Sequence, residues 1–343
     1  MKEKSFILYV IYLDKFTEGF VNFFKQENSR FDNKFIIYGK KQQFKFEADC
    51  NEILFVGSYK SINKSTVAYK WACDADAIIF SGIFGSEKLF LKFPKSAINK
   101  SYLQFWGGDF YDLREKLPFY KIKEKISTAI KIHYIKKVKG IINLISGDYN
   151  ELNKIVKTNA DHFIAPVYGV NKNKNFCSSM FTTDKSENPI KICIGNSATK
   201  TNNHFEVFDY LKKYKNENIR IICPLSYGDK NYANEVISYG KNIFGDKFEP
   251  LTDYLSREKY FKMLSGCKIG IFNNNRQQAM GNINAFIVMG AKVYIKSDTS
   301  MWGTYAHERQ YAIYEVEKIP QIDFNEFILT AMVNFIYDDI FNL

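Results

Sequence analysis

The alternation of short apolar runs with amphipathic stretches is the feature that most constrains how this chain can fold. Nearly continuous apolar runs are typical of strands that are buried on both faces, and helical stretches between them supply the connections of a parallel sheet. The pattern therefore predicts the α/β class. The predicted strands are Phe6–Leu13, Phe35–Tyr38, Ile53–Val56, Ala77–Phe80, Tyr102–Phe105, Gly140–Ile145, His162–Ala165, Lys191–Ile194, Ile219–Cys223, Phe248–Pro250, Lys268–Phe272 and Lys292–Ile295.

The alternation stops once, at a polar stretch over 171–189, and then restarts. So long a loop is uncommon inside a compact unit, which predicts a connection between two domains. We expect a Rossmann-like domain over 1–170, a second one over 190–320 and a helical tail over 321–343. Ligands of such sheets bind outside the carboxyl ends of the strands, so a cleft between the two domains is the default site.

Composition narrows the classes of protein. Lys and Arg number 48 and Asp and Glu 37, a net charge of +11, and basic proteins attract phosphate groups. The first apolar run, Phe6–Leu13, is too short to span a bilayer and lacks a cleavage pattern, so we expect a cytoplasmic protein. The six cysteines lie too far apart for zinc knuckles, which predicts reduced thiols, and no nucleic-acid recognition motif is present.

A polar loop rich in small residues follows the strand Lys191–Ile194 and leads into a helix. Glycine allows close backbone approach, Ser and Asn side chains can hydrogen-bond a ligand, and a lysine adds positive charge. The loop suits a phosphate or the edge of a sugar, although ordinary helix capping is the better explanation of the motif taken alone. The candidate donor-binding residues here are Gly195, Asn196, Ser197, Lys200 and Asn202.

A second polar loop, Asn273–Gln278, connects a buried strand to an apolar helix. Arg276 can hold a diphosphate with two parallel hydrogen bonds, and a helix start adds free N–H groups and a positive dipole end. The alternative is a solvated loop with Arg276 in a surface ion pair. We predict a diphosphate site at this loop, with Arg276 as its cationic group. The remaining candidates are Gln277, Gln278, Gly281 and Asn282.

The segment Trp106–Asp112 follows another predicted strand and carries two glycines and a carboxylate. Asp109 is a candidate general base for an acceptor hydroxyl, or it caps the helix that follows. The pair Asp74 and Asp76 precedes its strand, at the wrong end of a parallel sheet for a metal site, and indicates a turn. His204 is expected on a helix surface.

The segment Lys116–Lys139 combines an apolar stripe at helical spacing with many lysines and one acid, Glu124. Such a helix is typical of a protein that lies on anionic lipid. A helix packed on the sheet, with a solvated basic face, is the alternative, and the two interpretations are compatible. The candidate membrane contacts are Lys121, Lys123, Lys125, Lys131, Lys136 and Lys137.

Four of these segments together resemble glycosyltransferase family 56. The segments are Gly195–His204, Ile222–Val236, Cys267–Gly281 and Trp106–Glu115, and the first three occur in the order and spacing of the family. The family comprises TDP-N-acetylfucosamine:lipid II N-acetylfucosaminyltransferases of enterobacterial common antigen synthesis. The Arg-Gln-Gln step and the Gly-Asn-Ser turn are its most specific pieces.

The resemblance implies a GT-B fold, in which two Rossmann-like domains face each other across a cleft. The C-terminal domain would bind the nucleotide sugar, with Pro224 and Tyr227 beside the nucleoside, and the N-terminal domain would face a polyprenyl-linked acceptor at the inner membrane. No metal or other cofactor is expected. The sequence departs from the family at 198–202 and 279–282, which leaves the donor sugar open.

Two other classes of protein fit the same motifs. One is a nucleotide-sugar enzyme of another kind, such as an epimerase or hydrolase, which would need no lipid acceptor. The other is a non-catalytic subunit of a glycan assembly complex. The presence of Arg276 argues against the second, because a subunit without chemistry needs no group to neutralise a leaving diphosphate.

Overall fold

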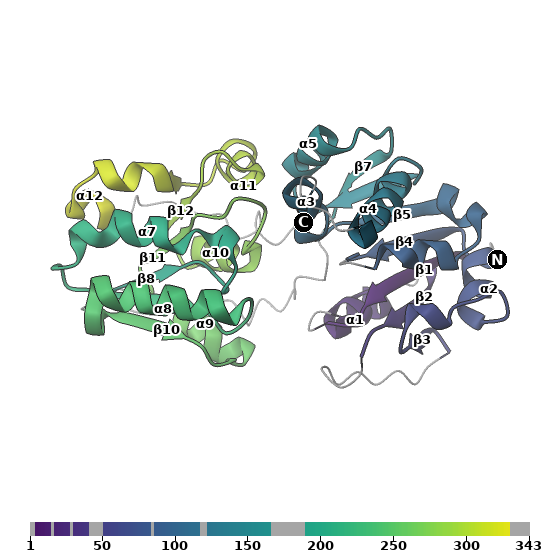
Figure 1. Ribbon diagram of the computed structural model, residues 1–343, viewed down its shortest axis with the longest axis horizontal. Helices are drawn as coiled ribbons and strands as arrows, with labels where there is room; N and C mark the ends of the chain where they lie inside the picture. Colours follow the sequence, from purple (N-terminus) through teal and green to yellow (C-terminus); the bar gives the residue numbers. More distant parts are fainter. Residues whose placement is uncertain are drawn as a thin grey trace. The chain divides into compact units, whose positions relative to one another are not determined.

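The chain forms two α/β units, which span Met1–Val170 and Asn171–Leu343 (Figure 1). The computed structural model describes residues 4–14, 17–27, 30–40, 51–83, 86–116, 122–165 and 189–329. The predicted linker over 171–189 and the tail beyond Leu329 lie almost entirely outside these ranges. All twelve predicted strands are present, within a few residues of their expected bounds.

The N-terminal unit is a parallel sheet of seven strands in the order β3-β2-β1-β4-β5-β6-β7. Alternate residues of β1 enter two different cores, so the sheet is buried on both faces. The strands are β1 Ser5–Tyr12, β2 Phe31–Tyr38, β3 Ile53–Val56, β4 Ala77–Ser81, β5 Ser101–Gln104, β6 Gly140–Asn143 and β7 Asp161–Ile164. The helices are α1 Thr17–Glu27, η1 Tyr59–Ser61, α2 Val67–Asp74, η2 Glu87–Lys92, η3 Lys95–Lys100, α3 Gly108–Lys116, α4 Ile122–Ile135 and α5 Ser146–Ile155.

The C-terminal unit is a parallel sheet of six strands in the order β10-β9-β8-β11-β12-β13. Its strands are β8 Ile190–Ile194, β9 Ile219–Pro224, β10 Phe248–Leu251, β11 Ile269–Phe272, β12 Lys292–Ile295 and β13 Ile313–Glu315. Its helices are η4 Lys200–Asn202, α7 His204–Leu211, η5 Lys212–Tyr214, α8 Lys230–Phe244, η6 Gly245–Lys247, α9 Arg257–Ser265, α10 Met280–Val288, α11 Ser300–Trp302, the π-helix η7 Gly303–Glu308, η8 Val316–Gln321 and α12 Phe324–Ile328.

Helices cover both faces of the C-terminal sheet. α7 and α8 lie side by side on one face, where they share a core with Ile269 and Ile271 of β11 (Figure 1). The alternate residue Phe272 packs against Phe286 of α10, with ring centroids 5.8 Å apart, so α10 covers the opposite face. α10 stops at Gly290, whose φ of +64° is the left-handed conformation that ends helices.

Strand β13 and helix η7 were not predicted from the sequence. β13 has only three residues, too few to show a periodic pattern, and it pairs with β12 as the last strand of the sheet in the part of the chain that the structure describes. The π-helical turn η7 has no sequence signature of its own. Among the described residues no helix combines the length and the apolar character needed to cross a membrane.

Lys131 corrects one part of the predicted lipid-facing surface. Its side chain is only 2% exposed, and its Nζ lies 3.0 Å from Asp112 Oδ1 and 3.5 Å from Glu87 Oε1. The same ammonium donates to the backbone carbonyl of Asp109. Lys131 therefore faces inward, because three oxygens replace the water that a charged group needs. Lys125, which is exposed on the same helix, remains available to lipid.

Replacement of Lys131 should test this buried ion-pair cluster. We expect Lys131→Met to lower the free energy of unfolding by about 3–5 kcal/mol, because Glu87 and Asp112 would be left without their cation. The matched change Lys125→Met, on the exposed face, should stay within about 0.5 kcal/mol of the wild type. Urea unfolding followed by circular dichroism measures both. Equal losses in the two variants would contradict a special role of Lys131.

Candidate functional site

The strand order of the C-terminal sheet reverses between β8 and β11, which lie next to each other. The chain leaves β8 toward α7 on one face and leaves β11 toward α10 on the other, so the two loops part above the strand ends. Such a switch point is where open α/β sheets bind ligands. Both polar loops predicted from the sequence meet here, since the backbone N–H of Asn275 donates to the carbonyl of Thr201 at 3.0 Å.

Gly195 forms the turn directly after β8. Its φ is +68°, and a β-carbon there would lie 2.7 Å from His204 Nε2 and 2.8 Å from Asn202 Oδ1. Only glycine fits without displacing both side chains. Asn202 is fully buried and shapes the turn, because its Oδ1 accepts the backbone N–H of Asn196 at 3.1 Å. Asn202 is thus part of the support beneath the loop.

His204 lies in the core, which corrects its expected position on a helix surface. The ring is fully buried, and its Nδ1 lies 3.2 Å from the Tyr232 hydroxyl. Burial lowers the pKa of His204 to about 4. The imidazole is therefore neutral at physiological pH and adds no positive charge to the site.

Gln278 joins the two loops across the switch point. Its Nε2 donates to Asn196 Oδ1 at 3.1 Å and to Ser197 Oγ at 3.2 Å, and its Oε1 accepts from Thr201 Oγ1 at 2.8 Å. Asn196 in turn donates to the hydroxyl of Tyr227 at 2.7 Å. These side chains hold one another in place, and direct contact with a ligand stays a prediction for each of them.

The loop after β9 completes this side of the site. Tyr227 is 48% exposed, whereas Pro224 is buried as the last residue of β9. Pro224 thus exposes little surface, and its predicted place beside the nucleoside stays a prediction. The backbone N–H of Ala198 donates to the Tyr227 carbonyl at 2.8 Å, and Gly228 permits the close approach because a β-carbon there would lie 2.4 Å from Ala198 O.

The loop before α10 carries the groups suited to a diphosphate. Arg276 is half-buried, and its Nη1 donates to the Gln277 carbonyl at 3.1 Å. Gly281, in the first helical turn, is exposed, and space around it is open. The start of the helix is therefore accessible, with the positive end of its dipole at the edge where the two loops meet.

Two buried carboxamides in this loop have unused hydrogen-bonding capacity. Asn274 is fully buried, and neither oxygen nor nitrogen of its side chain has a partner among the described residues. The same is true of the Oε1 of Gln277, a residue that is 3% exposed. Buried polar groups are nearly always paired, so unpaired ones mark a place where a ligand or ordered water supplies the partner. Asn274 was not among the residues predicted from the sequence, because nothing in the sequence shows that its side chain lacks a hydrogen-bond partner.

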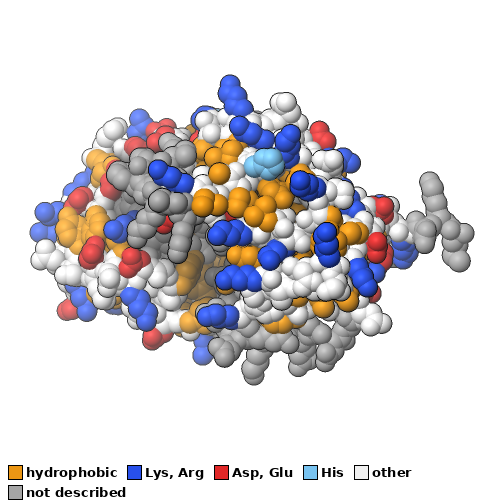
Figure 2. All heavy atoms as spheres, turned by 45° about the vertical axis from the view of Figure 1, so that its right-hand side comes forward, with side chains coloured by type: hydrophobic (Ala, Val, Ile, Leu, Met, Phe, Trp, Pro, Cys, Tyr) orange, Lys and Arg blue, Asp and Glu red, His pale blue; other side chains and the backbone are white. Residues whose placement is uncertain are grey.

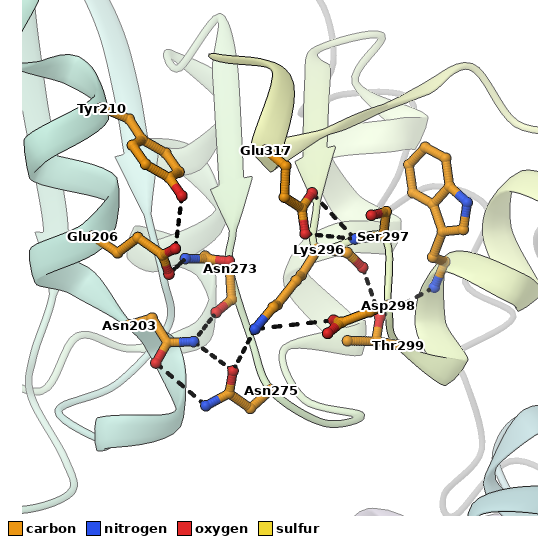
Figure 3. Close-up of polar contacts among 11 residues, drawn as sticks. Asn203, Glu206, Tyr210, Asn273, Asn275, Lys296, Ser297, Asp298, Thr299 and Glu317 are labelled. Carbon is orange, nitrogen blue, oxygen red and sulfur yellow. Dashed lines mark hydrogen bonds and ion pairs between the residues drawn. The ribbon is translucent and has the colours of Figure 1, made fainter. Parts of the chain in front are cut away.

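A network of polar side chains ties together the loops after β8, β11 and β12 (Figure 3). Asn203 donates to the Asn273 carbonyl and to Asn275 Oδ1, both at 2.7 Å. Lys296 reaches the same Asn275 oxygen at 2.9 Å and lies 3.9 Å from Asp298. Lys296 was not among the residues predicted from the sequence, because a single lysine after a strand does not indicate a binding site. Lys200 and Arg276 are the other cations carried by these loops.

Asp109 lies at the carboxyl edge of the N-terminal sheet, at the start of α3. It is 1% exposed, and its two oxygens accept the backbone N–H groups of Trp106 at 2.9 Å and Ile83 at 3.2 Å. Burial raises the pKa of Asp109 to about 6, while the positive charge of Lys131 opposes that shift. The carboxylate clamps the loops after β4 and β5. Its role as a catalytic base stays a prediction, and it would require this edge to open.

Acidic and sulfur side chains do not gather into a metal site in the part of the chain that the structure describes. Asp74 ends α2 and Asp76 accepts the backbone N–H of Phe6 at 2.8 Å, at the amino-terminal edge of the sheet. Both therefore belong to a helix-to-strand turn, as predicted. The expectation that the reaction needs no metal remains an expectation.

The architecture matches a group of solved structures over nearly the whole chain. The N-terminal domain of trehalose-6-phosphate phosphatase from Candida albicans has a TM-score of 0.61 at 10% identity, covering 96% of this chain and 92% of that one. A UDP-forming α,α-trehalose-phosphate synthase from Burkholderia xenovorans has a TM-score of 0.60 at 8% identity, and the match covers 93% of this chain and 89% of that one. A glycosyltransferase from Rickettsia africae has a TM-score of 0.60 at 14% identity, and the match covers 93% of this chain and 86% of that one. The fold is that of the GT-B glycosyltransferases.

The family follows from the sequence itself. The family model described as 4-alpha-L-fucosyltransferase, glycosyl transferase group 56, matches residues 13–327. The chain belongs to this family and is a glycosyltransferase. The family match confirms the resemblance inferred from Trp106–Glu115 and from the three C-terminal segments.

Ala279 offers a test of the backbone at the start of α10. Its φ of +60° costs an L-residue about 1–2 kcal/mol. We expect Ala279→Gly to stabilise the protein by roughly 0.5–1 kcal/mol after the added freedom of the unfolded chain is deducted. The control Ala285→Gly, inside the same helix, should destabilise it by about 1 kcal/mol. Urea unfolding curves compare the two, and destabilisation by both changes would argue against a strained Ala279.

Proposed function

We propose that this glycosyltransferase moves a deoxyamino sugar, such as N-acetylfucosamine, from a dTDP-linked donor to a polyprenyl-diphosphate-linked saccharide. The family model bears the name of a fucosyltransferase, which supports a 6-deoxyhexose as the transferred sugar. The acceptor follows from the resemblance to enzymes of enterobacterial common antigen synthesis. The reaction belongs to the assembly of a surface glycan at the cytoplasmic face of the inner membrane.

The observation that carries the donor site is the meeting of two polar loops at the switch point of the C-terminal sheet. The diphosphate would lie between Arg276, the start of α10 and the turn at Gly195. As the bond between the sugar and the diphosphate breaks, negative charge grows on the diphosphate. A guanidinium and the positive end of a helix offset this charge without a metal ion.

A shift of the unfolding temperature by nucleotides tests the donor site. We expect dTDP or UDP to stabilise the protein more than GDP or CMP, and EDTA to leave the effect unchanged. A ligand at 100 times its dissociation constant adds about 2.7 kcal/mol of stability. Arg276→Ala should abolish most of the shift. Arg220→Ala, which removes a solvent-accessible ion pair between Arg220 on β9 and Glu249 on β10, should retain it.

The outcomes separate the rival functions. Stabilisation by a nucleotide without any transfer to lipid-linked acceptors would favour an epimerase or hydrolase. Failure of all four nucleotides to stabilise the wild-type protein would remove the donor site, and a non-catalytic subunit would then be the better explanation. Loss of the shift on addition of EDTA would overturn the metal-independent mechanism.

Contact with the membrane is supported by the exposed part of α4 and its neighbour η2. Lys125, Lys136 and Lys137 are exposed, and apolar side chains lie exposed nearby, with Leu91 on η2 61% and Ile126 on α4 51% exposed. The two elements pack together through Tyr134 and Phe90. Figure 2 shows Lys and Arg side chains mixed with hydrophobic ones on the face in view. Lys121 lies outside the described residues, as does the side chain of Lys123.

Vesicle sedimentation tests this surface. Binding should require anionic lipid, because each lysine near the surface contributes about 1 kcal/mol through its charge. We expect Lys125→Glu, Lys136→Glu and Lys137→Glu together to abolish binding to vesicles of phosphatidylglycerol and phosphatidylcholine. Three lysine-to-glutamate changes in the C-terminal unit, at the exposed Lys230, Lys241 and Lys259, should reduce vesicle binding less. Equal losses would mean that total charge alone governs binding.

A further inference from the structure

Tyr260 and Asn282 form a pair at the switch point that neither the sequence motifs nor the proposed donor site uses as a unit. Asn282, in the first turn of α10, donates through Nδ2 to the hydroxyl of Tyr260 on α9 at 2.8 Å. Both side chains are half-buried, so they line a surface that is open to solvent. Among the described residues, the Asn282 carbonyl oxygen and the Tyr260 hydroxyl proton have no protein partner.

This pair adjoins the loops already described. Burial raises the pKa of Tyr260 well above its usual value, and the nearby Cys193 and Tyr227 raise it further. On the loops after β8 and β9, the Tyr227 hydroxyl accepts a hydrogen bond from Asn196. The C-terminal unit thus carries two hydrogen-bonded pairs of a tyrosine and an asparagine, one on α9 and α10 and the other on the loops after β8 and β9.

The chemistry of this lining suits a planar, neutral ligand. Tyrosine rings provide faces on which a nucleobase can stack, and stacking of one base on an aromatic ring is worth about 1–3 kcal/mol. No charged side chain belongs to the two pairs, so they do not resemble a phosphate site. The groups proposed to bind phosphate are Arg276 and the first turn of α10, the turn that also carries Asn282. A nucleotide with its diphosphate at the helix start would bring its base to the tyrosines.

The hydrogen bond between Asn282 and Tyr260 determines which atom of the pair can accept from a ligand and which can donate to it. Because its amide N–H is held by Tyr260, its carbonyl oxygen is left as an acceptor, and the Tyr260 hydroxyl adds a donor beside it. Uracil and thymine present an N–H next to a carbonyl on their imide edge, which matches an acceptor beside a donor. Cytosine presents an acceptor nitrogen where these bases carry the N–H, so it would face the Asn282 oxygen unpaired.

We propose that Tyr260 and Asn282 read the imide edge of a uracil or thymine base and so select the nucleotide of the donor. This inference rests on the proposed function, since it assumes that a nucleoside diphosphate binds at the switch point. It goes beyond that proposal by naming the two residues that choose the base. Neither side chain would contact the reacting sugar carbon, so they would act on specificity and not on the chemical step.

Isothermal titration of the full-length protein with UDP, CDP and inorganic pyrophosphate tests the assignment. The wild type should bind UDP at least about tenfold more tightly than CDP, since a lost hydrogen bond and an unpaired acceptor both penalise cytosine. Asn282→Ala should weaken the binding of UDP by about tenfold and leave the affinities for CDP and pyrophosphate nearly unchanged. Tyr260→Phe frees the Asn282 amide to turn, so it should narrow the difference between UDP and CDP.

Tyr254→Phe is the matched control, because Tyr254 precedes the same helix and is 76% exposed. It should keep the wild-type preference for UDP over CDP. Equal weakening of UDP, CDP and pyrophosphate by Asn282→Ala would mean that the pair only supports α10, and it would overturn the inference. An unchanged preference in both Asn282→Ala and Tyr260→Phe would overturn it as well. A wild type that binds pyrophosphate but neither UDP nor CDP would refute base recognition, while binding of none of the three would refute the donor site itself.

Discussion

The parallel pairing of β8 with β11 is the constraint on which the donor side of this protein depends. The two strands are distant in the sequence, yet their adjacency brings the loops that follow them to one edge of the sheet. Gln278 then bonds to three side chains of the opposite loop and fixes their separation. A site of this kind needs both conditions, because the sheet supplies proximity and the carboxamide supplies a defined distance.

The N-terminal unit uses a buried charge for a similar purpose. Lys131 brings α4, η2 and α3 together through Glu87, Asp112 and the carbonyl of Asp109. Asp109 in turn holds the loops after β4 and β5 by their backbone N–H groups. The helix proposed to lie on lipid is thus bonded to the sheet edge where an acceptor is expected. These contacts connect the two surfaces within the N-terminal unit.

In both units, the polar residues that support the loops are different from those that are left to contact a ligand. Many of the residues chosen from the sequence as ligand contacts turn out to hold other protein groups, as Asn202, Gln278 and Asp109 show. The groups that remain unpaired are less conspicuous in the sequence, such as the buried carboxamide of Asn274. Preorganisation explains this division, because a binding site holds its geometry only when a layer of hydrogen-bonded residues supports it.

The sequence by itself determined the α/β class, twelve of the thirteen strands that the structure describes, the polar loops after β8 and β11, and the family. Each of these is encoded locally, in hydrophobic periodicity, in helix-start residues or in short motifs. Tertiary structure alone decided that Lys131 faces inward, that His204 is buried and neutral, and that Tyr260 meets Asn282. These facts depend on contacts between elements far apart in the chain, and no local pattern records which side of a helix or strand a neighbour will cover.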